Sequence, residues 1–378
     1  MIVEQIKWSE QDHWQYVADK NLGERANLVF AFGPIDLIRH AERYAELKTR
    51  YPHADIITCS TNGEILNHTI SDNYIIVSAI LFEKTVVQAL QVDIQDVKDS
   101  FDAGTHLSAD LDKDLISNLI IIGDYQKING SDLLTGIHIN LSEHVPITGG
   151  MTGTRNSSVQ SLIGLNGPPK EGRVIGIGFS GEDLQVVHSL DSAWSSFGAE
   201  KTITKATDNR VYEIDHKSAS HFYTQYLNGL VDDVVQDSIF YPLGIKKKGG
   251  SKRIVRGVIA FHEDESISYA GNFNEGDSIR MMKTNISSLI RSSETAAELV
   301  LNKLNYENPD FVLIFNCVGR RNVLKDWTLD EVECVNSKFG SKTPMIGFYS
   351  HGEISPCTPQ TKSELHNQSV VITAFREA

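Results

Sequence analysis

One pattern of predicted elements occurs three times along the chain and constrains the fold more than any other feature. In each copy a short apolar run is followed by a helical segment, a second apolar run, a polar turn and a returning strand. Continuous apolar runs are typical of strands that are covered on both faces and joined by helical crossovers. The sequence therefore predicts an α/β fold of repeated strand–helix–strand units, with mixed, mostly parallel sheets in two domains around a central crevice. The first strands read "NLVFAF" (27–32), "NLIIIGD" (118–124) and "DFVLIFNC" (310–317).

A segment that does not follow this pattern separates the second and third copies, from about residue 201 to residue 308. It predicts a hairpin over residues 253–271 and a long helix over residues 281–306. Ahead of the first copy, "SEQDHWQYVADKN" opens with Ser9 as a helix N-cap and predicts a short surface helix. We expect an N-terminal helix or arm over residues 1–26, one domain over residues 27–215 and a second domain over residues 216–378.

The charge and hydropathy of the chain exclude several classes of partner. A formal net charge of −14 argues against nucleic acid or an anionic membrane surface as the main partner. No apolar run approaches the roughly 18 residues of a membrane span, and the polar N-terminus lacks the apolar centre of a signal peptide. We therefore expect a cytoplasmic protein. The four cysteines form no C-x-x-C pair, so neither a zinc finger nor a disulfide framework is predicted.

The turn after the second strand recurs almost unchanged in the first and third copies. "ADIITCSTNGEIL" (54–66) and "TPMIGFYSHGEIS" (343–355) share a Gly-Glu-Ile sequence, whose glutamates are Glu64 and Glu353. In one interpretation these glutamates face a ligand. In the other they bond to groups of their own turns and brace them, and the sequence leaves the choice open.

The three turns are predicted to line one crevice, because ligands of crossover units bind beyond the carboxyl ends of the strands. Gly149 and Gly150, in "PITGGMTG" of the second copy, allow positive φ and a close approach to a ligand. Asn62 and His351 precede the glycines of the other two turns and are predicted to contact the ligand. The candidate ligand-binding residues are Asn62, Glu64, Gly149, Gly150 and Glu353.

Several short motifs, in order, resemble the FIST family. "FNCVGR" and "GFYSHGEISP" are similar to its C-terminal signature, and "CSTNGEI", "PITGGMTG" and "ITKATDNRVYEID" to its N-terminal half. The resemblance implies that residues 27–215 and 216–378 are the FIST N-terminal and C-terminal domains of a ligand-sensing protein. Some stand-alone members bind haem, sense nitric oxide and act on a histidine kinase. The resemblance implies sensing and does not by itself choose the ligand. Our hypothesis is that this chain binds haem b, senses nitric oxide and signals to a histidine kinase, with a homodimer left open.

Haem requires a neutral imidazole or a thiolate on its iron, within an apolar pocket. His351, which follows an apolar strand, is the first candidate for the iron ligand, and His188 is the second. Tyr349, beside His351, is a further candidate to bind the cofactor. Arg320 and Arg321, in "VGRRN", are candidates to pair with the propionates. The chain has no C-x-x-C-H sequence, so covalent attachment is excluded and the haem would be b-type. The further candidates for an iron ligand are His138, His144 and Cys317.

Two other functions use the same residues. A sensor of an amino-acid-like metabolite would place Arg320 on a carboxylate and Glu64 or Glu353 on an ammonium group. An enzyme is the third hypothesis, since "GIGFSG" (176–181) matches G-x-G-x-x-G. The chain continues there as a predicted strand and not as the helix that would hold a pyrophosphate, so we expect no enzymatic activity.

Overall fold

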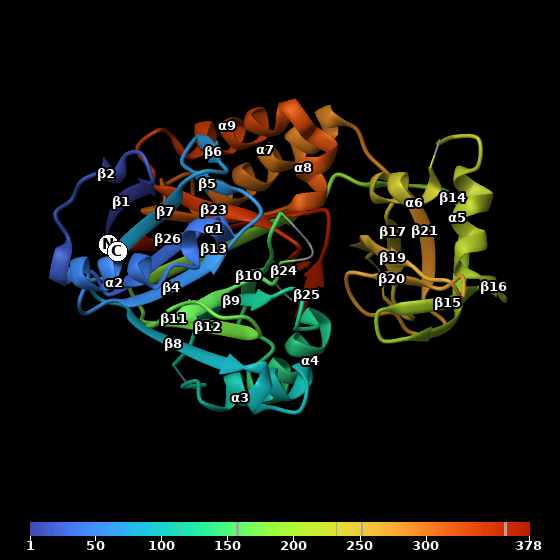
Figure 1. Ribbon diagram of the computed structural model, residues 1–378, viewed down its shortest axis with the longest axis horizontal. Helices are drawn as coiled ribbons and strands as arrows, with labels where there is room; N and C mark the ends of the chain where they lie inside the picture. The colour runs from blue at the N-terminus through green and yellow to red at the C-terminus, as the bar shows by residue number, and fades with distance from the viewer. Residues whose placement is uncertain (114, 156–158, 232, 251, 359–360) are drawn as a thin grey trace.

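The computed structural model describes residues 1–113, 115–155, 159–231, 233–250, 252–358 and 361–378. A large body contains both ends of the chain, and a smaller domain, residues 195–283, projects from one side of it (Figure 1). Among these described residues, the body contains three six-stranded sheets, and the smaller domain, hereafter the inserted domain, contains one eight-stranded sheet. The predicted boundary between residues 215 and 216 lies inside the inserted domain.

Each sheet of the body is built around one of the three predicted units. The first strand lies in the middle, the second strand pairs with it in parallel, and the returning strand pairs with its other edge in antiparallel. The first unit consists of β3 (Leu28–Gly33), α1 (Ile35–Ile38), α2 (Ala41–Arg50), β4 (Asp55–Ser60) and β7 (Ile75–Leu81). The second consists of β9 (Asn118–Asp124), α4 (Gly130–Asn140), β10 (Ile147–Thr152) and β12 (Arg173–Ser180). The third consists of β22 (Phe311–Cys317), α8 (Val318–Leu324), α9 (Thr328–Phe339), β23 (Met345–Ser350) and β26 (Val370–Glu377).

The sheets are mixed, as the sequence predicts, but they are not mostly parallel. Among the described strands, each sheet of the body has one parallel pair, and its other neighbours are antiparallel. The reason is that a parallel pair needs a long crossover, usually helical, and each unit has only one such crossover. The returning strands arrive without a helix and are therefore antiparallel.

The turn after each second strand carries the chain into the sheet of another unit. After β4, the hairpin of β5 (Glu64–Leu66) and β6 (Thr69–Ser71) joins the third unit, where β5 pairs with β23. After β23, the hairpin of β24 (Gly352–Pro356) and β25 (Ser363–His366) joins the second unit, where β24 pairs with β10. After β10, β11 (Ile163–Leu165) joins the first unit, where it pairs with β4. The exchange is cyclic, because each unit gives a strand to one neighbour and receives a strand from the other.

The short helix predicted to begin at Ser9 is wrong, because residues His13–Ala18 form a strand that pairs with another strand, Ile2–Ser9. Val3, Ile6 and Trp8 are buried, and this segment pairs with β7 along its length. The hydroxyl of Ser9 does not cap a helix; it accepts a hydrogen bond from the amide of Asp12 in the turn that follows. Beyond the returning strands the sheets continue with β1 (Ile2–Ser9) and β2 (His13–Ala18) after β7, with β8 (Val86–Asp93) after β12, and with β13 (Leu184–Asp191) after β26.

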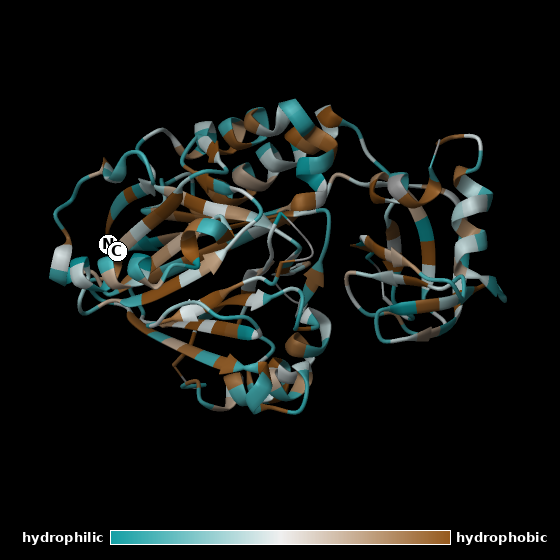
Figure 2. Cartoon of the chain, viewed as in Figure 1, coloured by the Kyte–Doolittle hydropathy of each residue, from teal (hydrophilic) through white to brown (hydrophobic). Residues whose placement is uncertain are grey.

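The inner faces of the three sheets meet in one apolar core. Phe30 of the first unit stacks on Phe311 of the third, with 6.3 Å between ring centroids, and Phe179 and Ile122 of the second unit join the same cluster. Helices cover the outer faces: α2 packs on the first sheet, α3 (Ser100–Ala109) and α4 on the second, and α7 (Ile286–Lys303) and α9 on the third. Figure 2 shows the apolar strands lying inside this shell of helices. None of the described helices combines the length and apolarity needed to cross a membrane.

The inserted domain leaves the body after β13 and returns at α7. Its sheet packs with α5 around a separate core that contains Tyr223, Leu243 and Tyr269. The two linkers lie side by side, since the hydroxyl of Thr284 donates to the carbonyl oxygen of Ala193 at 2.8 Å. The elements are β14 (Ser195–Thr207), β15 (Arg210–Ile214), β16 (Lys217–Ser218), α5 (Ala219–Leu227), α6 (Val234–Asp237), β17 (Leu243–Lys246), β18 (Ile254–Arg256), β19 (Val258–Phe261), β20 (Ile267–Tyr269) and β21 (Ser278–Lys283). The 3-10 helices of the chain are η1 (Gly23–Arg25), η2 (Ile94–Asp96), η3 (Ser238–Phe240) and η4 (Lys325–Trp327).

Candidate functional site

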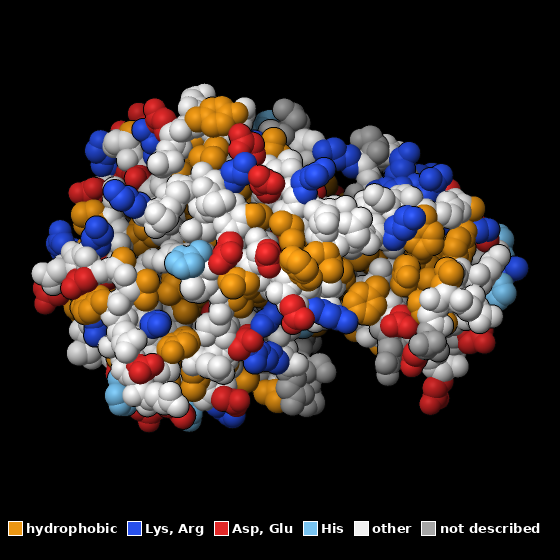
Figure 3. All heavy atoms as spheres, turned by 90° about the horizontal axis from the view of Figure 1, so that it is seen from above, with side chains coloured by type: hydrophobic (Ala, Val, Ile, Leu, Met, Phe, Trp, Pro, Cys, Tyr) orange, Lys and Arg blue, Asp and Glu red, His pale blue; other side chains and the backbone are white. Residues whose placement is uncertain are grey.

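The carboxyl ends of β4, β10 and β23 converge on one crevice, as the sequence predicts. Asn62, Thr154 and His351 follow these three strands, and all three line a cavity of about 1270 Å³. The inserted domain forms the opposite wall, with Val258 and Ile259. Figure 3 shows hydrophobic side chains gathered where the body and the inserted domain meet. The crevice therefore lies between the two parts of the molecule.

His351 is held on several sides at the base of the crevice. Its imidazole stacks on the ring of Tyr125, with 4.6 Å between centroids, and its Nε2 lies 3.4 Å from the side-chain nitrogen Nδ2 of Asn62. Gly153 packs so closely that a Cβ there would be 2.1 Å from Cδ2 of the imidazole. Burial lowers the pKa of His351 to about 4, although a backbone hydrogen bond with Thr154 opposes the shift. The imidazole is therefore neutral at physiological pH.

Glu64 and Glu353 brace their own turns. The hydroxyl of Thr61 donates to Oε1 of Glu64 at 2.5 Å, and the equivalent hydroxyl of Ser350 donates to Oε1 of Glu353 at 2.6 Å. The amide and the hydroxyl of Ser369 also donate to Glu353. Burial raises the pKa of Glu64 to about 8 and that of Glu353 to about 7. The described lining of the crevice includes neither carboxyl, so the contacts match the bracing interpretation.

Gly149 and Gly150 are needed for the packing of the sheets. A Cβ on Gly149 would lie 1.9 Å from the carbonyl oxygen of Ile121 in the neighbouring strand, and its φ of 151° is one that other residues rarely adopt. A Cβ on Gly150 would lie 2.7 Å from the ring of Phe315 in the central core. The structure places both glycines beneath the crevice and not in its described lining.

Arg320 is buried in the third unit and does not reach the crevice. Its guanidinium forms an ion pair with Glu331 and donates to the carbonyl oxygens of Ser192 and Leu289. It also donates to the hydroxyl of Ser293 at 2.8 Å. The prediction that Arg320 binds a propionate or a metabolite carboxylate is therefore wrong, because this side chain is 0% exposed and already paired with Glu331.

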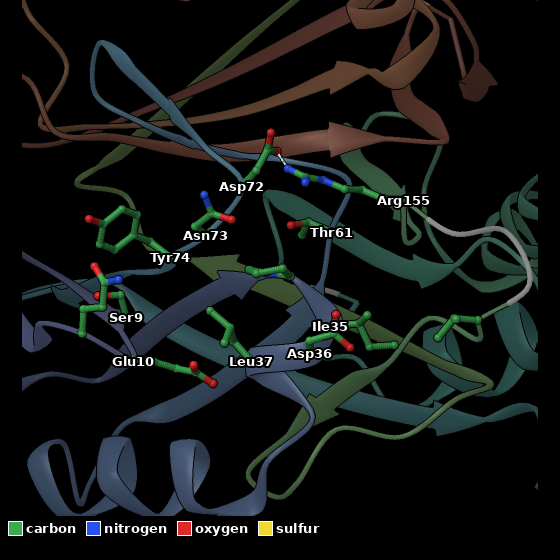
Figure 4. A pocket seen from close by; sticks show the side chains of 13 residues that line it. Ser9, Glu10, Ile35, Asp36, Leu37, Thr61, Asp72, Asn73, Tyr74 and Arg155 are labelled. Carbon is green, nitrogen blue, oxygen red and sulfur yellow. Dashed lines mark ion pairs between the residues drawn. The ribbon is translucent and has the colours of Figure 1, made fainter.

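Of the two adjacent arginines, Arg321 is the one whose side chain lines the crevice. Its two terminal nitrogens donate to the two carboxylate oxygens of Asp72, at 2.9 and 2.6 Å, and Nη1 also donates to the carbonyl oxygen of Asn62 at 2.7 Å. Arg155 forms a second ion pair with the same aspartate, as Figure 4 shows. Gly63 makes this arrangement feasible, since a Cβ there would be 2.1 Å from Nη1 of Arg321.

The charged residues of the lining leave one excess positive charge. Arg155, Arg321 and Lys325 are opposed by Asp72 and Asp326. The charges of Arg155 and Arg321 lower the pKa of Glu64, but burial raises it more, so this carboxyl stays protonated at neutral pH. The excess positive charge at the base of the crevice attracts anionic groups, and a guanidinium group can bind a carboxylate in a bidentate manner.

Two further predicted residues lie away from the crevice. His188 is on β13, where burial lowers its pKa to about 4, and its carbonyl oxygen accepts a hydrogen bond from Lys303 of α7. Tyr349 is fully buried beneath Arg321, whose guanidinium lies 5.1 Å from its ring centroid. Neither side chain is in the described lining of the crevice. Among the described residues, no group of three or more His, Cys, Asp or Glu side chains is arranged to hold a metal ion.

The β24–β25 hairpin connects the crevice to the inserted domain. It begins directly after His351, at the base of the crevice. Near its other end, Arg256 of the inserted domain donates to the carbonyl oxygen of Leu365 at 2.6 Å, and Lys247 forms an ion pair with Glu364. The hairpin therefore links the base of the crevice to contacts with the inserted domain.

The sequence did not predict Tyr125, Asp72 or Arg155 as part of the site, nor the wall of the crevice that the inserted domain forms. Asp72 follows a short polar hairpin that pairs with a distant sheet, and no local pattern indicates this. The sequence did offer one indication of Arg155, which directly follows "GGMTGT" in the turn of the second copy. Arg321 was one of two adjacent arginines, and only the structure distinguishes them.

The raised pKa of Glu353 predicts that stability falls as the pH rises. Between pH 4.5 and about 7 the folded carboxyl keeps its proton while the unfolded one has released it, so the free energy of unfolding decreases across this window. The expected decrease is about 3 kcal/mol, at about 1.4 kcal/mol per pKa unit. Urea unfolding at pH 5 and pH 7.5 measures it, and Glu353→Gln should make the pH dependence smaller by about this amount, with the contribution of Glu64, whose pKa is about 8, remaining. Exposed Glu333→Gln is the control, and an equal pH dependence in wild type and Glu353→Gln would contradict this assignment.

Family models match most of the chain. The model of the FIST N domain matches residues 27–217, and that of the FIST C domain matches residues 219–356. The two matches meet inside the inserted domain, between β16 and α5. No curated protein matches the chain.

Proposed function

Because this chain belongs to the FIST family, whose domains are sensory, we propose that it is a sensor that binds a small carboxylate-bearing ligand in the crevice. An amino-acid-like metabolite is the proposed kind of ligand. The observation that carries the proposal is the excess positive charge beside Arg321 and Arg155, in a protein whose formal net charge is −14. In an acidic protein, an anionic group binds more favourably at a local positive site than at the rest of the surface.

The lining of the crevice suits the parts of such a ligand. Its carboxylate would lie against the guanidinium of Arg321, which sits at the ends of the strands. Its apolar portion would pack on Ile259 of the inserted domain and Leu329 of the body, which are 46% and 43% exposed. Asp326, on the same lining, would supply a carboxylate to an ammonium group. Burial of both apolar side chains by a ligand would contribute about 25 cal/mol per Å² of apolar surface removed from water.

A ligand that contacts both walls would favour one placement of the inserted domain over others, and this difference is the signal. The β24–β25 hairpin would transmit movement of His351 to the contacts of Arg256 and Lys247. The linker residue Ala193 has a φ of 59°, a strained value of the kind that gathers at moving joints. We propose a histidine kinase as the partner that receives the signal. The proposal assigns binding to the crevice and no catalysis.

Replacement of Arg321 by alanine should lower the affinity for the carboxylate ligand about 10- to 100-fold, because a hydrogen bond to a charged group contributes about 1.5–3 kcal/mol. A thermal-shift screen of amino acids and small carboxylic acids would find ligands, and calorimetric titration would measure their affinity. Arg291→Ala, exposed on α7, is the matched control and should bind like the wild type. The proposal fails if no carboxylate-bearing compound binds, or if Arg321→Ala binds it as tightly as the wild type.

A second candidate is haem b with nitric oxide as the signal, and the neutral imidazole of His351 favours it. Iron binds a neutral imidazole, and Arg321 lies on the same lining to pair with a propionate, so the residues fit the group chemically. Nε2 of His351 faces the amide of Asn62, which would have to move aside for an iron ligand. A bound haem would supply an iron centre for a diatomic gas. The role of the chain would be to hold His351 neutral and to pass its displacement to the β24–β25 hairpin.

Absorbance spectra separate the two candidates. If the second candidate holds, added haem gives a sharp Soret band that shifts with nitric oxide in the ferrous protein, and His351→Ala loses it. A spectrum like that of free haem rejects haem binding and leaves the metabolite sensor. Autophosphorylation of the partner kinase that does not change with the sensor, with or without its ligand, would reject the proposed output.

A further inference from the structure

Asp72 is the shared partner of two cations that come from different units. It lies directly after β6, on the hairpin that the first unit places in the sheet of the third. Arg321 comes from α8 of the third unit, and Arg155 follows β10 of the second. All three side chains are partly exposed, with 30% for Asp72, 23% for Arg321 and 46% for Arg155. This contact therefore ties all three units together at the surface of the crevice.

The same aspartate separates two cavities. Asp72 and Arg155 line the crevice, and both also line a neighbouring cavity of about 660 Å³ that is bordered by Pro34, Thr61 and Tyr74 (Figure 4). In Figure 4 the carboxylate of Asp72 points at the guanidinium of Arg155 across the upper side of this cavity. The ion pairs of Asp72 therefore form part of the wall between the two cavities.

Asp72 occupies the position that an incoming carboxylate would need. Both terminal nitrogens of Arg321 donate to its two oxygens, and Nη1 donates to the carbonyl oxygen of Asn62 as well. A guanidinium edge of two parallel N–H groups binds one carboxylate in the bidentate manner. A second carboxylate therefore cannot bind this edge while Asp72 remains there.

Resting on the function proposed above, we infer that Asp72 is a built-in competitor that sets the affinity and anion specificity of the crevice. A ligand binds by exchange: its carboxylate takes the place of Asp72 on Arg321 and Arg155. The exchange requires an anionic group, so neutral analogues of the ligand do not bind. It also releases the end of the β5–β6 hairpin, which is held to the third unit by the pairing of β5 with β23.

Succinate, a small dicarboxylate, is the probe that tests this inference. Asp72→Asn removes the competing charge and keeps the size of the side chain, so we expect succinate to bind at least tenfold more tightly than to the wild type. Asp72→Glu keeps the charge and should bind weakly, like the wild type. Asp72→Asn combined with Arg321→Ala should lose the gain. Calorimetric titration of the full chain measures all four affinities, and circular dichroism checks that each variant is folded.

Equal or weaker succinate binding by Asp72→Asn overturns the inference, and so does the absence of binding by every variant. Retention of the gain in the double variant also overturns it, because the freed cation would not be Arg321. Hydrogen exchange gives a second measurement: a saturating carboxylate ligand should speed exchange of the β6 amides in the wild type, and unchanged exchange counts against the displacement. The function proposed above is judged separately, from the carboxylate screen on the wild type and Arg321→Ala. Binding in that screen with no effect of Asp72→Asn keeps the sensor and rejects the competitor.

Discussion

Replacement of Arg320 by methionine is expected to lower the free energy of unfolding by about 3–5 kcal/mol, the cost of breaking a buried ion pair by removing one partner. The variant leaves Glu331 buried in the third unit, with hydrogen bonds from Asn316 and Ser293 but without its cation. An uncompensated charge in an apolar interior is costly, so the effect comes from the glutamate left behind more than from the lost contact. Urea unfolding at 25 °C measures the change.

Two further variants separate the charge from the packing. Arg320→Met combined with Glu331→Leu removes both charges and should recover a large part of the lost stability, since apolar replacement of a buried pair is often neutral. Arg321→Met is the neighbouring control, and we expect a change of about 1 kcal/mol or less because its ion pair is partly exposed. A loss below about 1 kcal/mol for Arg320→Met would contradict the view that this arginine is structural.

Gly149→Ala is expected to cost about 3 kcal/mol or more, because the new Cβ meets backbone that cannot move away. That Cβ would lie 1.9 Å from the carbonyl oxygen of Ile121, and the φ of 151° adds backbone strain. Gly167→Ala is the matched control, since its nearest neighbour is 3.9 Å away and its stability should be almost unchanged. The same urea series measures both variants. A Gly149→Ala protein as stable as Gly167→Ala would contradict the close packing of Gly149 against the backbone of Ile121.

The repeated units were predictable because they depend on local sequence. Apolar runs of strand length, joined by amphipathic or capped helices, specify a crossover wherever they occur. Asn129 illustrates this: its side chain caps α4 (Gly130–Asn140), the helical segment of the second copy. Strand β1 was missed because the serine that resembles a helix cap forms a tight turn between two strands.

The exchange of hairpins was not predictable from the same patterns. β5 is three residues long and looks the same whether it pairs with its own sheet or with β23. Its partner lies hundreds of residues away, and periodicity carries no information on such pairing. The prediction that Arg320 contacts the ligand was wrong for a related reason, because adjacent residues of a helix point in different directions. Arg320 therefore faces the core and Arg321 faces the crevice, and the sequence "VGRRN" could not assign them.

The cyclic exchange of strands has a consequence for synthesis of the chain on the ribosome. The second unit is complete in its own strands once β12 has emerged, yet its sheet still lacks β24, which lies near residue 352. Domains of a nascent chain generally fold from the N-terminus as they appear. Here the sheet of the second unit keeps an open edge at β10 until β24 has been made, so final closure of the body has to follow synthesis of the third unit.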